Sequence, residues 1–418
     1  MSEASSGTRV LVVGGGIIGL SCAWYLRRTG FDVTLIDRNK IGAACSHGNC
    51  GLVCPSHVLP LTEPGAFREA LKSLLDRKAA FKLRLRPDPA LLSWMWKFST
   101  RCNTKSMLAA AQPISALLGS AMDEYETWVG DEGFECQWDK QGLLFVYQTK
   151  QKLDAYEPTN QLLAEQFDEP ASKLSASETL ELEPALKPTV AGSWYYQHDA
   201  HLRPDLLIAT LRGRLKDMGV EIREECAFES LVGRINASAA CTQTGEIAFD
   251  HCVVACGAWS PKLNAQLGVK IPIEPGKGYS ITTPRPEKCP RIPMIFPEHR
   301  VAVTPLRDAY RLGSIMEFVG WNDQISEQRL RLLTDGASNY LHTPVGNQVD
   351  ERWYGWRPMT PDSIPIIGKC PGWTNVWLAT GHNMLGLSMA PATGKLVAEL
   401  LSGQSPHVPA APYRLERL

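Results

Sequence analysis

The sequence predicts an α/β protein with two domains. One is a Rossmann-like domain assembled from separate segments, and the other has a mixed or antiparallel sheet and inserted helices. The first observation is a βαβ unit with a strand at Arg9–Val13, a helix at Ile17–Arg28 and a second strand at 33–37. The second is a change of character between residues 56 and 188, where helical patterns dominate. The third is an apolar strand at 251–257 that ends in a glycine turn and returns the chain to the first sheet.

The other elements follow from local patterns along the chain. Helical periodicity predicts helices at 67–75, 91–98, 114–129, 204–218 and 385–401. Alternating or apolar runs predict strands at 143–147, 220–223, 279–282, 301–304, 310–314 and 376–379. We therefore expect the Rossmann-like domain to comprise 8–57, 195–270 and 352–405. The second domain then comprises 58–194 and 271–351.

Composition excludes several classes of function. The chain has 418 residues, enough for two or three domains, and 43 Lys and Arg balance 44 Asp and Glu. Because the net charge is only -1, no overall field favours nucleic acid. The twelve cysteines are scattered, and no secretory signal precedes the first strand. We expect reduced thiols in a cytoplasmic protein, without an apolar run long enough to span a membrane.

A glycine-rich turn joins the first strand to the first helix and predicts a dinucleotide site. Gly14 permits a tight turn, Gly16 lets a pyrophosphate approach the backbone, and Gly19 lets the helix pack closely on the strand. Ile17 and Ile18 form the first turn of the helix that follows. The N–H groups of this turn would face the phosphates. Downstream, Asp37 can accept hydrogen bonds from the adenosine ribose, and Arg38 follows it. This motif alone does not distinguish FAD from NAD.

Further motifs resemble a known family of flavoenzymes over residues 9–403. They are the Gly14–Gly19 turn, the loop 45–51, the run 275–280, the block 355–362, and Thr380, Gly381 and His382 followed by Gly386. Together they resemble the small subunit of D-amino acid dehydrogenase and its relatives in the glycine oxidase and sarcosine oxidase group. The resemblance implies that the cofactor is FAD.

The resemblance also implies which further residues contact FAD. In the early loop these are Ser46, Asn49, Gly51 and Leu52, although His47 and Cys50 depart from the family pattern. Gly257 and Trp259 follow a strand that would lie against the dinucleotide. Gly381, Leu385 and Gly386 start the last helix, whose N-terminus would face the flavin and favour its anionic reduced form.

Three side chains are candidates for the catalytic site. The resemblance implies that Arg357 binds the substrate carboxylate, and a guanidinium can do so in a bidentate pair. The alternative is that Arg357 pairs with a structural carboxylate such as Asp362. Tyr279 would line the pocket or bond the carboxylate, although it could equally be a half-buried strand residue. His382 is a donor to substrate or flavin, or a structural histidine at a helix start.

Two further features have a functional and a structural interpretation. Cys45, His47, Cys50 and Cys54 could be metal ligands, but their spacing matches no usual zinc site, and we expect no metal. Residues 68–105 contain ten Lys or Arg and three Asp or Glu, with Trp94 and Trp96 close together. This segment could be a peripheral contact with a membrane or quinone, or a solvated face with both tryptophans in the core.

The predicted activity is FAD-dependent dehydrogenation of a D-amino acid, or of a cyclic D-imino acid such as hydroxy-D-proline. Hydride would pass from the α carbon to flavin N5, and the electrons to a quinone or another acceptor. No general base is required if the amine binds in its neutral form. Two alternatives remain open at this point. One is an oxidase that uses oxygen, like glycine or sarcosine oxidase, and the other is a catalytically silent flavoprotein subunit.

Overall fold

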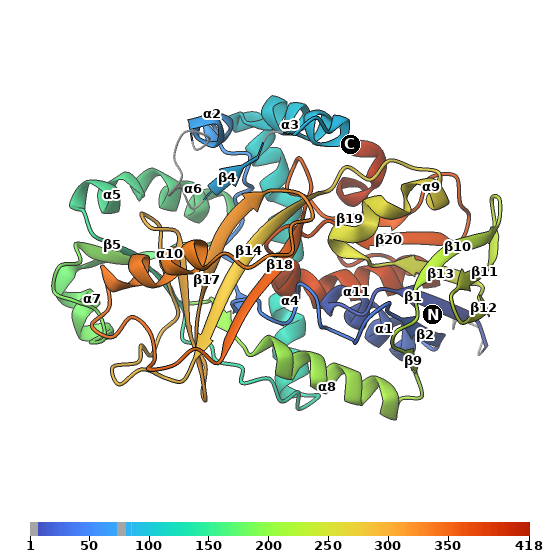
Figure 1. Ribbon diagram of the computed structural model, residues 1–418, viewed down its shortest axis with the longest axis horizontal. Coiled ribbons are helices and arrows are strands. Elements are labelled where there is room, and N and C mark those ends of the chain that lie inside the picture. Colours follow the sequence, from blue (N-terminus) through green and yellow to red (C-terminus); the bar gives the residue numbers. More distant parts are fainter. Residues whose placement is uncertain (1–6, 73–80, 85) are drawn as a thin grey trace.

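The computed structural model describes residues 7–72, 81–84 and 86–418. Within this part of the chain the strands form a six-stranded sheet, a nine-stranded sheet, and smaller sheets of three and two strands. Figure 1 shows the two large sheets side by side, with the chain passing between them several times. The predicted fold class, a Rossmann-like domain of discontinuous segments combined with a mixed sheet, is confirmed.

The six-stranded sheet contains the N-terminal βαβ unit. In spatial order its strands are β19 (Ile366–Lys369), β20 (Val376–Thr380), β13 (His251–Val254), β1 (Arg9–Val13), β2 (Asp32–Ile36) and β9 (Glu221–Arg223). All neighbours are parallel except β19, which is antiparallel to β20. The strand order reverses at β1, which lies between β2 and β13. In open sheets of this kind, ligands bind beyond the carboxyl ends of the strands at such a reversal.

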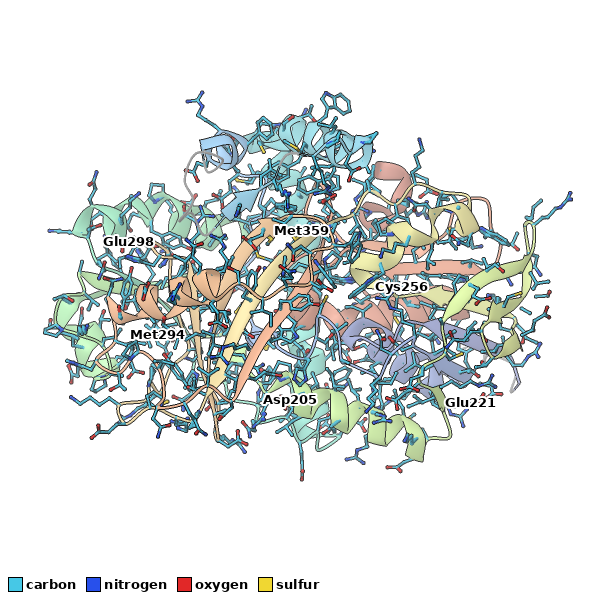
Figure 2. The ribbon with its side chains drawn as sticks, in the orientation of Figure 1. Asp205, Glu221, Cys256, Met294, Glu298 and Met359 are labelled. Carbon is cyan, nitrogen blue, oxygen red and sulfur yellow. The ribbon has the colours of Figure 1, made fainter. Side chains whose placement is uncertain are left out.

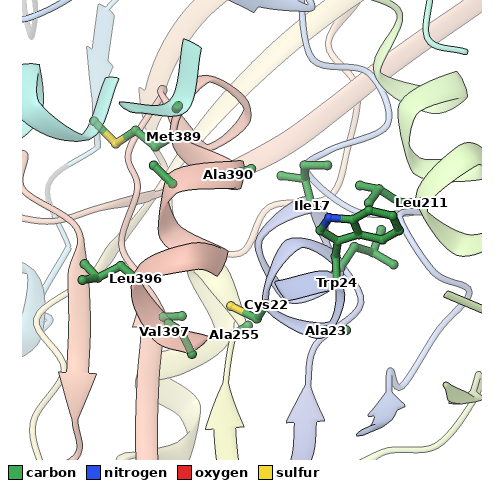
Figure 3. Packing of buried hydrophobic residues seen from close by; sticks show 14 of the residues in the cluster. Ile17, Cys22, Ala23, Trp24, Leu211, Ala255, Met389, Ala390, Leu396 and Val397 are labelled. Carbon is green, nitrogen blue, oxygen red and sulfur yellow. The ribbon is translucent and has the colours of Figure 1, made fainter. Parts of the chain in front are cut away.

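Helices from distant segments pack against this sheet and against each other. They are α1 (Ile17–Arg28), α4 (Thr104–Gly130), α8 (Pro204–Asp217) and α11 (Gly386–Ser402). Figure 3 shows α1 beside α11: the small side chain of Cys22 lies on the side of α1 toward Val397 of α11, whereas Trp24 points the other way, toward Leu211 of α8. Small side chains let the two helices approach closely, which fixes the start of each helix at the same edge of the sheet.

The nine-stranded sheet is the mixed sheet predicted for the second domain. Its strands in order are β18 (Glu351–Met359), β14 (Glu274–Thr283), β17 (Tyr310–Phe318), β16 (Val301–Pro305), β15 (Met294–Phe296), β5 (Leu143–Tyr147), β7 (Gly192–Tyr196) and β6 (Ser172–Ser175), with β4 (Phe81–Leu83) paired to β17. The pairs are antiparallel except β15 with β5 and β17 with β4. Helix α10 (Glu327–Ser338) covers the strands β14 to β17 with its apolar side.

The remaining elements are short or lie at the periphery. The helices are α2 (Ala66–Lys72), α3 (Pro89–Arg101), α5 (Lys150–Ala155), α6 (Glu157–Phe167), α7 (Ala176–Leu182) and α9 (Asn264–Leu267), with 3-10 turns η2 (Gly257–Leu263), η3 (Ala411–Tyr413) and η4 (Leu415–Arg417). The strands are β3 (Leu52–Val53), β8 (Ala200–His201), β10 (Phe228–Gly233), β11 (Ala237–Thr242) and β12 (Gly245–Ala248). None of the helices in the described ranges is long and apolar enough to cross a membrane.

Two elements cross the domain boundaries expected from the sequence. Strand β18 pairs with β14 in the nine-stranded sheet, although the boundary at residue 352 assigns almost all of it to the Rossmann-like domain. Helix α4, from the inserted segment 58–194, packs instead on α11, where the Tyr125 hydroxyl donates to the Leu387 carbonyl at 2.7 Å. If the sheets define the domains, the third Rossmann-like segment starts after β18. The helix predicted at 67–75 is described as far as residue 72, and its end lies outside the described residues.

Candidate active site

The glycine turn after β1 adopts the geometry that its sequence predicts. Gly14 has a φ of +110°, and a Cβ there would lie 2.6 Å from the Ala255 carbonyl oxygen. A Cβ on Gly19 would overlap the Gly14 carbonyl oxygen, so this glycine permits the close packing of α1 on the turn. At Gly16, in contrast, the nearest atom would be the Ser46 hydroxyl at 3.6 Å. The backbone at Gly16 is therefore open to an approaching ligand.

The start of α1 is suited to bind an anion. Its first turn contains no acidic residue, and Gly16 provides no side-chain cap. Only the N–H of Ile17 has a side-chain acceptor, because it donates to the Ser46 hydroxyl at 3.1 Å. The neighbouring N–H of Ile18 belongs to the first helical turn, where no carbonyl of the helix can accept it. These donors, with the open backbone at Gly16, fit the pyrophosphate of a dinucleotide.

The other predicted cofactor residues follow the carboxyl ends of neighbouring strands. Asp37 follows β2, and its carboxylate accepts N–H bonds from Gly15 at 2.7 Å and Asn39 at 2.8 Å. Burial raises the pKa of this carboxyl above its usual value. Gly257, with a φ of +52°, follows β13, and Gly381, with a φ of +78°, follows β20. Because these strands are parallel, all of these turns lie at one edge of the sheet, around the end of β1.

Arg38 and Trp259 come from two of these turns and lie together. The Arg38 guanidinium is 4.6 Å from the centre of the Trp259 ring, a cation-π contact. Both line a second, open hollow of about 810 Å³, together with residues between 39 and 45 and part of β18. Their predicted contact with the cofactor stays a prediction.

The loop that carries Ser46, Asn49, Gly51 and Leu52 is fastened to the nine-stranded sheet. The Gly48 carbonyl accepts a hydrogen bond from the Ser280 hydroxyl at 2.8 Å. The Cys50 carbonyl accepts one from the Thr304 hydroxyl at 2.7 Å, and the Asn49 carbonyl one from the Arg311 guanidinium at 2.7 Å. Arg311 is 2% exposed. The sequence analysis missed these three anchors, since only the fold brings residues 280–311 to this loop.

Within the loop, Asn49 and Gly51 set the backbone path. The Asn49 side chain accepts the Gly51 N–H at 2.8 Å, which closes a local turn. Gly51 has a φ of +79°, and a Cβ there would overlap the Leu202 carbonyl oxygen. The loop then continues into Leu52, which lines a large cavity. The predicted contacts of these residues with FAD stay a prediction.

The large cavity has a volume of about 920 Å³ and lies where the loop, the nine-stranded sheet and the start of α11 meet. Its polar or chemically reactive lining includes Asn49, Cys54, His57, Tyr279, Arg357 and Ser388. Its apolar lining includes Trp94, Met316, Phe318 and Met359, which belong to one buried cluster. Figure 2 shows Met359 near the middle of the molecule. The volume is in the range of small-molecule binding sites.

Arg357 projects into this cavity from β18 and lies across β14. A Cβ at Gly278 would overlap the Arg357 guanidinium, so the absence of a side chain at Gly278 makes the space that Arg357 occupies. The guanidinium donates from Nη1 to the Ile315 carbonyl at 2.7 Å and from Nη2 to the Ser314 carbonyl at 3.4 Å. These two bonds fix the plane of the guanidinium.

Arg357 has no carboxylate partner among the described residues. Asp362, the structural alternative considered from the sequence, instead accepts a hydrogen bond from Arg417 at 2.9 Å. Burial lowers the pKa of the Arg357 guanidinium from its usual value, while the Cys50 and Cys45 thiols beside it oppose this shift. A half-buried cation without a counter-ion is costly unless an anion binds to it. Arg357 is therefore a candidate for binding a carboxylate in the cavity.

Tyr279 lines the same cavity, but its hydroxyl already has a partner. It donates to the Glu317 carboxylate at 2.7 Å, and Glu317 in turn pairs with Arg329 at 2.8 Å. Burial and Glu317 raise the pKa of the Tyr279 hydroxyl, which keeps it protonated. Lys277, on the same strand, donates to the Gln324 carbonyl at 2.5 Å. The aromatic ring of Tyr279 can contact a substrate, while its predicted bond to a carboxylate stays a prediction.

His382 is buried beneath α11. Its Nε2 is 3.0 Å from the Thr393 hydroxyl, and burial lowers its pKa to about 3, so the ring is neutral. The next residue, Asn383, has the better-defined role. It has a φ of +52°, donates to the Ser363 and Gly381 carbonyls at 2.9 Å and accepts the Thr360 N–H at 2.9 Å. Asn383 thus fixes the start of α11. The catalytic role predicted for His382 stays untested, and this position suits a structural residue.

The four cysteine and histidine residues weighed as metal ligands are not brought together. His47 pairs with Glu351 at 2.7 Å, and the Cys45 thiol donates to the Trp356 carbonyl at 2.7 Å. Within the described ranges, the cluster of metal-ligand type is a different one. It consists of Cys54, His57 and Asp199, whose ligand atoms all lie within 4.8 Å of one another.

Comparisons with known proteins show the family and the fold of this chain. The family model described as FAD dependent oxidoreductase matches residues 9–400. The D-amino acid dehydrogenase of Vibrio cholerae serotype O1 is 33% identical over 95% of this chain and 96% of its own length, and that of Vibrio vulnificus is 30% identical over the same shares. Glycine oxidase from Geobacillus kaustophilus has a similar structure, with a TM-score of 0.76, 20% identity and coverage of 99% of this chain and 100% of its own.

Proposed function

Because the chain belongs to the family of FAD dependent oxidoreductases, we propose that it dehydrogenates a D-amino acid, or a cyclic D-imino acid such as hydroxy-D-proline. The observation that carries the proposal is Arg357, a guanidinium that faces the cavity without a carboxylate partner in the described residues. An amino acid supplies that carboxylate. The D configuration rests on the two Vibrio relatives, both D-amino acid dehydrogenases that match nearly the whole chain.

The residues present fit FAD, and each would have a distinct task. The open backbone at Gly16 and the start of α1 would hold the pyrophosphate, Asp37 the ribose, and the 46–52 loop the flavin. FAD, when bound, would supply the acceptor for the hydride of the α carbon, which carries both electrons of the oxidation. Arg357 orients the substrate through its carboxylate, and the apolar cluster with Met316 and Phe318 keeps water away from the reacting carbon. The resulting imine hydrolyses to a 2-oxo acid unless it is cyclic.

The test is an anaerobic screen of the flavin-loaded protein. D-amino acids, L-amino acids, N-alkylated glycines and cyclic imino acids are mixed with it in turn, and the absorbance of the oxidised flavin is followed. We expect D-amino acids or D-imino acids to bleach the flavin, and their L enantiomers to leave it oxidised. Bleaching by L-amino acids or sarcosine alone would contradict the proposed substrate class. A flavin that no amine reduces would instead favour the silent subunit.

We further propose that the electrons leave to a quinone or another acceptor of a respiratory chain. The proposal rests on the dehydrogenases among the relatives, and it separates the enzyme from an oxidase. After anaerobic reduction, the flavin should be reoxidised faster by a soluble quinone than by air-saturated buffer, with little hydrogen peroxide formed. Stoichiometric peroxide in air, at a rate that matches turnover, would assign the enzyme to the oxidases instead.

We also propose a peripheral contact with an anionic membrane at its inner face, through α3 and β4. On α3, Leu92 is 55% exposed and Trp96 is 66% exposed, whereas Trp94 is buried and donates to the Met359 carbonyl. Lys82 on β4 and Arg84 just after it are also exposed, and exposed basic and aromatic side chains together favour interfacial binding. Arg77 and Lys78 of the same basic segment lie outside the described residues. Sedimentation with phosphatidylglycerol vesicles should decrease in Trp96→Ala; equal sedimentation of both proteins would contradict this contact.

A further inference from the structure

A buried carboxylate without a cation lies beside the large cavity. Asp199 is 0% exposed, and it forms no ion pair with any described residue. It is instead held by Ser56, whose hydroxyl donates to Oδ2 at 2.6 Å and whose N–H donates to Oδ1 at 3.2 Å. The sequence pattern does not predict the contact between Ser56 and Asp199, because the two residues are far apart in the chain. The antiparallel pair of β3 and β8 brings them together, with Val53 opposite Ala200.

Ser56 links this carboxylate to a histidine at the cavity wall. The Ser56 hydroxyl is 3.5 Å from Nδ1 of His57, and His57 lines the cavity that Arg357 also lines. Because the Ser56 hydroxyl donates its hydrogen to Asp199, the Ser56 oxygen can only accept a hydrogen bond from His57. The long contact to His57 therefore favours a proton on Nδ1, which leaves the lone pair on Nε2. The ring is further positioned by the edge of Phe145, at 5.7 Å between centres.

We propose that His57 accepts a proton from the substrate ammonium and that Ser56 and Asp199 form a buried relay behind it. This inference rests on the proposed function, because an amino acid reaches the cavity mainly as an ammonium ion at neutral pH and must lose a proton before its nitrogen can form a double bond to carbon. In the relay, one N–H bond of the ammonium breaks and an Nε2–H bond forms. The Nδ1 proton passes to Ser56 as the Ser56 hydroxyl proton passes to Asp199. The products are a neutral amine and a carboxylic acid.

The surroundings of Asp199 suit it to end this relay. Burial raises the pKa of its carboxyl to about 7, so that it gains and loses a proton near neutral pH. It is faced by the Cys54 thiol, by Tyr196 on β7, and by Glu169 after α6, with Tyr156 at the start of α6 beyond them. None of these groups carries a positive charge. Burial lowers the pKa of His57 to about 4, so His57 is neutral when substrate binds and transmits the proton rather than storing it.

The experiment is the pH dependence of anaerobic flavin reduction by a saturating D-amino acid that reduces the wild-type protein. We expect the wild-type rate to rise with pH and to bend near pH 7. In Asp199→Asn, which keeps an oxygen that can accept from Ser56, the rate at pH 7 should fall at least tenfold and recover to within about threefold at pH 10, where the amine is already neutral. His57→Gln and Ser56→Ala should show the same displaced profile.

Two control variants separate the relay from structural effects. His201→Gln removes a buried histidine two residues from Asp199 that does not line the cavity, and it should keep the wild-type profile. Glu169→Gln removes a neighbouring negative charge, and it should move the bend to lower pH without changing the plateau. Circular dichroism and flavin content establish that each variant is folded.

Three outcomes would overturn the relay. One is a wild-type profile in Asp199→Asn and His57→Gln, and another is an equal loss of rate at every pH. The third is one equivalent of zinc in the purified protein that disappears in Cys54→Ala, because Cys54, His57 and Asp199 would then be metal ligands. If a D-amino acid bleaches the wild-type flavin, but the variants keep the wild-type profile or lose rate equally at every pH, the relay fails and the proposed function stands. If no amine bleaches wild-type flavin, both fail.

Discussion

At the scale of single residues, Arg357 on β18 is held by an irregularity in β17, the strand on the far side of β14. Ile315 has a φ of +61°, a left-handed conformation that is unfavourable for a β-branched residue, and it lies at an irregularity where β17 pairs with β14. The same irregularity presents the Ile315 and Ser314 carbonyls to the guanidinium. Strain of this kind persists where the surrounding structure enforces it, and here it aims two acceptors at the residue that we propose binds the substrate.

The first prediction concerns Arg357 itself. In Arg357→Ala, kcat/KM for a D-amino acid should fall by about 100-fold or more, because removing one partner of a desolvated charge pair costs about 2–5 kcal/mol. The flavin spectrum should not change. Arg357→Lys should recover only part of the activity, since an ammonium cannot form the planar bidentate pair. The matched control is Arg352→Ala, an exposed arginine on the same strand, and a comparable loss in it would contradict the assignment.

The second prediction separates two glycines of the N-terminal turn. Gly16→Ala should fold like wild type, because the added Cβ meets nothing closer than 3.6 Å, yet it should lose FAD, since it occupies the space for the pyrophosphate. Gly19→Ala should instead be unstable, because its Cβ overlaps a backbone oxygen. Bound flavin is measured by absorbance after gel filtration, and folding by circular dichroism. A stable Gly16→Ala protein with normal flavin content would contradict the placement of the pyrophosphate.

How far single residues could be predicted depends on whether their reason is local. Gly14, Gly19 and Asp37 were found because turn geometry and chain spacing define them. Arg311 and Asp199 were missed, since their partners lie more than a hundred residues away and only the strand pairing brings them together. Asn383 could have been predicted as a turn residue, because asparagine tolerates the left-handed conformation that its turn requires.

At the scale of elements, the contact of α1 with α11 fixes the edge of the sheet at which cofactor and substrate meet. A Cβ on Gly394 of α11 would lie 2.4 Å from the carbonyl oxygen and 2.5 Å from the carbonyl carbon of Ser21 in α1. The two helices therefore touch through their backbones at this point. Their N-termini then start close to the ends of β1 and β20. The 46–52 loop passes between these helices and the nine-stranded sheet.

The third prediction tests this contact with two glycine substitutions. Gly394→Ala should lower the free energy of unfolding by about 2 kcal/mol, because backbone atoms cannot move aside as a flexible side chain can. Gly213→Ala, in the exposed middle of α8 with no atom within 4 Å, should raise it by about 1 kcal/mol through helix propensity. Thermal or urea unfolding of flavin-free protein measures both. An opposite order of the two variants would contradict the close contact.

Elements with strong local patterns were predicted well. Strands β1 and β5 and helix α1 have the bounds that periodicity predicted. The assignment of elements to sheets was harder, because periodicity does not contain pairing information. β18 itself contains Gly355 and Pro358, which are typical of a loop. Its place beside β14 depends on nine residue pairs that the sequence pattern does not predict.

At the scale of the whole molecule, the predicted FAD site draws on segments distributed along the entire chain. The glycine turn, Asp37 and the turns after β13 and β20 come from the six-stranded sheet. The 46–52 loop is anchored by β14, β16 and β17 of the other sheet. A cofactor that contacts both sets of residues stabilises their relative arrangement, and not only one domain.

The last prediction follows from this distribution. A ligand that binds only the native state stabilises it by RT ln(1 + [L]/Kd), about 2.7 kcal/mol at a concentration of 100 Kd. For a chain of this length, with an unfolding entropy of about 2.1 cal/mol/K per residue, that is a rise in Tm of about 3 °C. We therefore expect flavin-free protein to unfold in calorimetry a few degrees below the holoenzyme, to regain that Tm when FAD is added, and to gain nothing from FAD in the Gly16→Ala variant. The Arg357→Ala variant should keep the full rise in Tm on addition of FAD, because Arg357 is proposed to bind the substrate and not the cofactor. If FAD raised the Tm of Gly16→Ala as much as that of wild type, the pyrophosphate would bind elsewhere, and the edge at the end of β1 would not be the cofactor site.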